Sequence, residues 1–162
     1  MTVPADQDLS RREEMAVSGA AMSSAPWGGA AVTGGAVAAA DLGLHVIDGS
    51  IHLSALSGSL SAGAAVFIIV AAGGALLKAR GTRAARWIRA YPWRFAVFPA
   101  LAAAAIALVL SVLTGGGVVG GIISGLWHGG AVYGITGAIG TVARARKRPS
   151  YLRDDRARPS LS

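Results

Sequence analysis

The sequence predicts an all-α integral membrane protein, a small bundle of four transmembrane helices, with three helices as the alternative. Two observations support this fold class. Hydrophobic residues make up 53% of the 162 residues and charged residues only 14%, whereas soluble domains carry about a quarter charged residues. The apolar residues are also gathered into long uncharged runs that arginine-rich segments separate. A chain of this length is enough for one compact bundle.

Three segments have the pattern of spanning helices: 60–77, 95–113 and 117–142. The first two carry no charge, and at about 1.5 Å per residue 60–77 covers roughly 27 Å, close to the hydrocarbon thickness of a bilayer. The third is longer and rich in glycine. Each must be helical if it spans, because in hydrocarbon the backbone has to satisfy its own hydrogen bonds and three segments cannot close a barrel.

A fourth segment, 30–56, is apolar but contains two aspartates and two histidines. A charged residue at a helix centre costs roughly 3 kcal/mol on insertion scales, so this segment inserts poorly by itself. It can insert as a hairpin with 60–77, joined by a tight Ser-Gly-Ser turn at 57–59. Four helices place both chain ends on one side of the membrane, whereas three place them on opposite sides. We favour four.

The chain divides into three regions. Residues 1–28, which contain two prolines and no apolar run, are predicted to be a disordered N-terminal tail, with a short helix over 6–17 as an alternative because Asp6 and Asp8 favour a helix N-terminus. Residues 29–142 form the transmembrane domain, and residues 143–162 form a basic cytoplasmic tail. The C-terminus is expected in the cytoplasm because basic loops are retained there.

The net charge of +7 comes from bases that flank the apolar runs. This placement favours contact with anionic lipid headgroups over binding to nucleic acid. Arginines also alternate with tryptophan and tyrosine in 78–94, which predicts a short interfacial helix that ends before Pro92. The basic side chains expected to face lipid headgroups are Arg80, Arg83, Arg86, Arg89, Arg144, Arg146, Lys147 and Arg148.

Aspartate and histidine alternate at helical spacing in the first apolar segment. At about 100° per residue the four side chains fall within about 60° of one another on a helix. Such a stripe can bind a divalent metal or pass protons. It can equally be structural, with its members pairing with each other or facing water. The candidate ligands for an ion or proton are Asp41, His45, Asp48 and His52, with His128 as a further ligand from the last helix.

Glycine recurs every fourth residue in the last apolar segment. A repeated small residue at this spacing removes side chains along one ridge, so another helix can approach closely. The pattern indicates a glycine zipper that packs inside the bundle, or else one that drives self-association into an oligomer. The four residues are Gly117, Gly121, Gly125 and Gly129.

No enzyme is indicated. The chain has no cysteine, which excludes disulfides, thiolate metal sites and cysteine nucleophiles. It also lacks a phosphate loop, HExxH and GxSxG, and no spacing specifies a cofactor, although a haem between His45 or His52 and His128 is conceivable. We therefore expect a structural or accessory membrane protein that associates with itself or with a larger membrane complex. The alternative is a transporter or channel subunit for protons or a divalent metal.

The heavy use of Ala, Gly, Val and Arg with few Lys resembles proteins encoded by GC-rich bacterial genomes, such as those of actinobacteria. The resemblance is one of composition over the whole chain. It implies a location in the bacterial plasma (inner) membrane.

A reporter fused after Ser162 should behave as a cytoplasmic protein. All lysines and arginines except Arg11 and Arg12 flank the last two apolar runs on one side, so the positive-inside rule places this end in the cytoplasm. Paired fusions to alkaline phosphatase and to green fluorescent protein test this. A fusion with phosphatase activity and no fluorescence would contradict the predicted topology.

Overall fold

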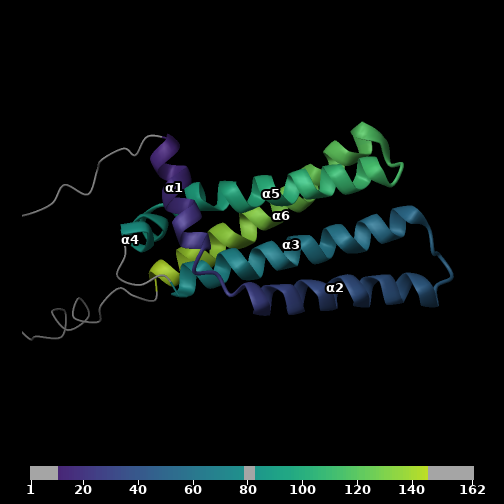
Figure 1. The fold of residues 1–162 in the computed structure, drawn as a ribbon, viewed down its shortest axis with the longest axis horizontal. Coiled ribbons are helices and arrows are strands. Elements are labelled where there is room, and N and C mark those ends of the chain that lie inside the picture. Colours follow the sequence, from purple (N-terminus) through teal and green to yellow (C-terminus); the bar gives the residue numbers. More distant parts are fainter. Residues whose placement is uncertain (1–10, 79–82, 146–162) are drawn as a thin grey trace, which may run out of the picture.

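The computed structural model describes residues 11–78 and 83–145, which form helices and turns with no strand (Figure 1). The predicted all-helical fold is therefore confirmed for the described part of the chain. Its helices are α1 (Arg11–Met22), α2 (Trp27–Ile47), α3 (Leu53–Lys78), α4 (Arg83–Ala90), α5 (Pro92–Leu113) and α6 (Gly117–Ala145).

The four long helices form two antiparallel hairpins, α2–α3 and α5–α6 (Figure 1). Both hairpin turns lie at one end of the bundle, and the short helices α1 and α4 lie at the other end. All four long helices have the length and hydropathy needed to cross a membrane, which indicates a membrane protein. This arrangement follows the four-helix alternative, with the chain entering and leaving the bundle at the same end.

The first predicted helix, 30–56, is wrong at its C-terminal side, because α2 ends at Ile47. Asp48 caps it, with its N–H bonded to Leu44 O at 3.0 Å. Gly49 then adopts a φ of 67°, a left-handed conformation that ends helices and suits glycine. The chain turns here, and the turn predicted at 57–59 instead lies within α3.

The predicted disorder of residues 1–28 is also wrong for the part that the structure describes, because residues 11–22 form α1. Glu13 and Glu14 lie in its first turn, where negative charge stabilises the helix dipole. Glu14 pairs with Arg94 of α5 at 3.2 Å, and Ala21 is buried in a core cluster. These contacts hold α1 against the bundle, although its sequence is polar overall. Residues 1–10 lie outside the described residues.

Helix α4 is the short helix expected before Pro92. It does more than anchor the chain, because Trp87 and Ile88 are buried in one cluster with Leu76 of α3 and Phe95 of α5. The cluster closes the bundle at the end where α1 and α4 lie (Figure 1).

The glycines of α6 pack against α5. A Cβ added at Gly125 would lie 2.9 Å from Ala104 O, and one added at Gly129 would lie 2.9 Å from Ala104 Cβ. Gly121 is similarly close to Leu108 O, at 3.1 Å. Gly117 differs from the other three, because it is exposed at the start of α6 with a φ of 68° and open space around it.

Gly125→Leu should destabilise the bundle by at least about 1–3 kcal/mol, because the new side chain overlaps the α5 backbone. Gly130→Leu is the matched control on the same helix, since a Cβ at Gly130 meets nothing within 4 Å. Thermal unfolding in detergent measures both. Equal melting temperatures for the two variants would contradict the observed packing of α6 on α5.

Candidate functional site

The backbones of α2 and α3 come into direct contact at two glycines. A Cβ added at Gly34 would lie 2.6 Å from Gly63 O, and one added at Gly63 would lie 2.6 Å from the Cβ of Ala38. Only small residues permit so close an approach. Because the helices are antiparallel, the turn of α2 that follows Ala38 faces the turn of α3 that precedes Gly63. These two turns carry Asp41 and Ser59.

Asp41 and Ser59 join the two helices through their side chains. The distance between Ser59 Oγ and Asp41 Oδ2 is 2.6 Å. Ser59 is almost fully buried, with 1% of its surface exposed. Its Oγ also lies 3.0 Å from Ala55 O, one turn earlier in α3. The contact is thus a chain of three oxygens that runs from the α2 carboxyl group to the α3 backbone.

His45 lies beside the same carboxyl group. Its Nδ1 is 2.9 Å from the backbone oxygen of Asp41, and because a carbonyl oxygen only accepts, Nδ1 is the donor. The distance from Nδ1 to Asp41 Oδ2 is 3.8 Å. The side chains of His45 and Asp41 are 36% and 40% exposed, so the site opens to the surface of α2 while Ser59 closes its inner side.

The other predicted ligands do not join this site. Asp48 and His52 are exposed in the turn between α2 and α3. His128 is on α6, where its Nδ1 contacts Ser124 O at 2.8 Å, and α6 packs mainly on α5 and α3 rather than on α2. Among the described residues, no group of three or more His, Asp or Glu side chains is placed to hold a metal ion.

The predicted lipid-facing bases lie at the end opposite the hairpin turns, as far as they are described. Arg86 and Arg144 are exposed and Arg89 is half-buried. Arg144 donates a hydrogen bond from Nη1 to Ala90 O at 3.3 Å, which ties the end of α6 to α4. Arg83 begins α4. The predicted residues Arg80, Arg146, Lys147 and Arg148 lie outside the described residues.

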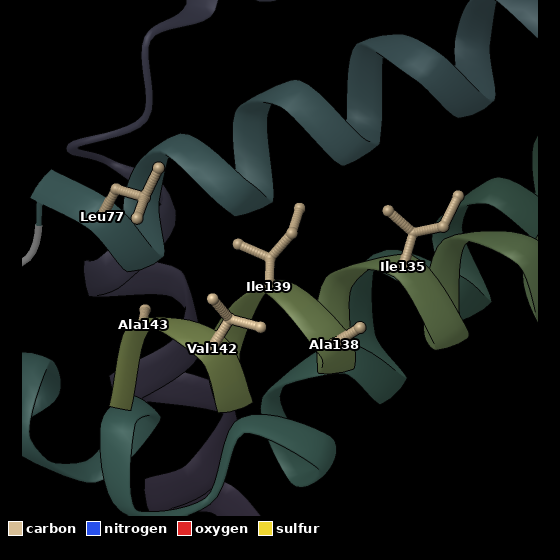
Figure 2. A pocket seen from close by; sticks show the side chains of 6 residues that line it. All are labelled: Leu77, Ile135, Ala138, Ile139, Val142 and Ala143. Atoms are coloured by element: carbon tan, nitrogen blue, oxygen red, sulfur yellow. The ribbon is translucent and has the colours of Figure 1, made fainter. Parts of the chain in front are cut away.

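An apolar groove of about 440 Å³ opens between α3 and α6 near the same end. Figure 2 shows Leu77 of α3 on one side of the groove and Ile135, Ile139 and Val142 spaced along α6 on the other. Its lining side chains are all aliphatic. The groove therefore offers apolar surface and no group for acid–base or metal chemistry.

The two hairpins are an internal sequence repeat, which was not among the sequence-based predictions. Residues 26–78 align with residues 92–144 without a gap, at a constant offset of 66 positions. The signal was a Pro-Trp pair at the start of each hairpin and a glycine in each turn. Residues that recur unchanged include Pro26 and Pro92, Trp27 and Trp93, Ala38 and Ala104, Gly49 and Gly115, Gly63 and Gly129, and Gly74 and Gly140.

The contacts recur at the same offset as the residues. A Cβ on Gly74 would overlap the ring of Pro26, and one on Gly140 would overlap Pro92. The indole of Trp27 packs on Phe67 with ring centroids 5.7 Å apart. The equivalent rings, Trp93 and Tyr133, are 5.3 Å apart. Both turn glycines have positive φ, 67° at Gly49 and 84° at Gly115. The repeat is therefore present in the three-dimensional structure as well as in the sequence.

Comparison of the chain with known proteins finds no matching family, curated protein or solved structure.

Ser59→Ala should lower the free energy of unfolding by about 0.5–2 kcal/mol, because it removes the hydrogen bond to Asp41 across the two helices. Ser57→Ala is the control on the same helix, since the Ser57 hydroxyl bonds only the local Ser54 O at 2.9 Å. Unfolding in mixed micelles with increasing denaturing detergent provides the measurement. Equal losses in both variants would mean that the Asp41 contact contributes nothing to the α2–α3 pairing.

Proposed function

We propose that this chain is a small multi-pass membrane protein of structural or accessory type that associates through α2 with a second copy or with another membrane protein. The observation that carries the proposal is the exposure of α2. Only 11% of its apolar window is buried inside the chain, compared with 50% for α3. Helix α2 packs on α3 at one edge of the bundle, which leaves most of its surface for another helix.

The polar residues of α2 strengthen this argument. Asp41 and His45 are partly exposed on a helix that is otherwise apolar. In hydrocarbon, exposed ionisable groups cost several kcal/mol, and they usually face protein or a wet cavity. A neighbouring helix laid along α2 would shield both side chains from lipid.

We therefore place the proposed association surface on α2 and not on the glycines of α6. Gly121, Gly125 and Gly129 are buried against α5, so the ridge predicted for self-association is already occupied within the chain. The basic end of the bundle, which includes Lys78 and Arg144, is proposed to face the cytoplasm and anionic lipid of the plasma membrane.

A photoreactive benzophenone attached at Gly35→Cys should form protein adducts in native membranes. Leu101→Cys is the matched control, because it is the equivalent position of the second hairpin, 66 residues later, and both positions are exposed. The absence of native cysteine makes the labelling specific. The Leu101 label should mark only lipid. The mass of the Gly35 adduct separates a second copy from another protein, and lipid-only labelling at both positions would refute association through α2.

A further inference from the structure

The apolar groove between α3 and α6 lies on a surface whose equivalent in the other hairpin is buried. Ala72 and Leu76 of α3 are 0% and 2% exposed, because they pack in one cluster with Phe95 of α5. Their equivalents 66 residues later are Ala138 and Val142 of α6, and both line the groove. Val142 is 52% exposed. The same helix face is therefore covered on α3 and bare on α6.

The two faces differ because the outer helices pack differently. Helix α5 packs on α3 as well as on α6, whereas among the described residues α2 makes no comparable contact with α6. In a fully symmetric bundle, α2 would cover the groove as α5 covers the equivalent face of α3. The groove is thus the place of a helix that the fold does not supply, and its aliphatic lining stays open (Figure 2).

Each of the two helices places a base directly after the groove. Lys78 follows Leu77 at the end of α3, and Arg144 follows Ala143 near the end of α6. Leu77 and Ala143 both line the groove, and the two bases are equivalent positions of the repeat. Both bases are exposed. Arg144 uses one N–H for its bond to Ala90 O, and a guanidinium has five. Neither helix contains an acidic residue, so the groove ends at positive charge that no carboxylate of these helices neutralises.

We propose that the groove binds one anionic phospholipid, with an acyl chain along the aliphatic lining and the headgroup phosphate at Lys78 and Arg144. Ile135 and Ala143 are eight residues apart, so the groove extends about 12 Å along α6. One leaflet contributes roughly 15 Å of hydrocarbon. An acyl chain can therefore fill the groove while its phosphate stays level with the two bases. Ammonium and guanidinium groups form strong charge-assisted hydrogen bonds to phosphate oxygens.

A transmembrane helix of another protein fits the groove less well than a lipid does. Such a helix crosses both leaflets, about 30 Å of hydrocarbon, whereas the groove covers only the part nearest the bases. An apolar helix also brings no anionic group to the two bases. The lipid site rests on the membrane location proposed above, but it does not require association through α2.

Native mass spectrometry of the full chain in detergent tests the proposal, after lipid removal and addition of phosphatidylglycerol or phosphatidylcholine with identical acyl chains. The wild type should retain one phosphatidylglycerol and bind phosphatidylcholine more weakly, because only the former has a net negative charge. Lys78→Gln with Arg144→Gln should lower the affinity for phosphatidylglycerol about fivefold for each base removed. Arg11→Gln with Arg86→Gln is the charge-matched control and should bind as the wild type, since both are exposed bases of α1 and α4 at the same end of the bundle.

A substitution inside the groove tests where the lipid lies. Ala138→Trp places an indole on the aliphatic lining and should abolish retention of phosphatidylglycerol. Ala131→Trp is the matched control and should retain it, because Ala131 is exposed about two helical turns earlier on the same face and does not line the groove. The two charge variants decide the proposal if Ala138→Trp does not fold.

The proposal would be overturned by equal retention of the two phospholipids in the wild type, by equal affinities in the two charge variants, or by unchanged retention in Ala138→Trp. A wild-type dimer that Ala138→Trp dissociates would also overturn it, because the groove would then hold a second copy. Photolabelling from Gly35→Cys on α2 does not involve the groove, so failure of the lipid site is distinguishable from failure of the association through α2.

Discussion

The contact on which the rest of the structure depends is the approach of two backbones inside each hairpin. Gly63 meets α2 and Gly129 meets α5 at distances that leave no room for a side chain. In a bilayer, lipid tails are as apolar as leucine, so apolar burial alone gives helices little reason to associate. Close packing supplies the dispersion contacts instead, and these require small residues at the crossing. Each hairpin is therefore held together by small-residue contacts of its own.

The two units meet through equivalent surfaces. Gly73 of α3 contacts Ile139 of α6, and these two residues occupy the same position in the repeat. The short helices α1 and α4 also contact each other. Both turns lie at one end of the bundle (Figure 1), so the two hairpins run parallel to each other.

The two hairpins differ most at their outer helices, α2 and α5, and Asp41 and His45 lie on one of these. Helix α5 packs on α3 as well as on its own partner α6, whereas α2 packs mainly on α3. The exposed α2 carries Asp41 and His45, and the better covered α5 has Ala107 and Ser111 at the equivalent positions. The repeated fold accounts for the residues that the two hairpins share. Residues that differ between them, such as Asp41 and Ala107, are not needed for that fold in both hairpins.

The sequence by itself determined the helical class, the long apolar runs and the separation of bases from the hairpin turns, because these follow from composition and local periodicity. It also placed Asp41 and His45 one turn apart. The repeat was equally present in the sequence, in the Pro-Trp pairs at Pro26 and Pro92. Only the tertiary structure decided that Asp41 faces Ser59 and that His128 lies elsewhere. That pairing depends on the register between helices, which is set by the turn at Gly49 and the crossing at Gly63, and no local pattern along one helix specifies that register.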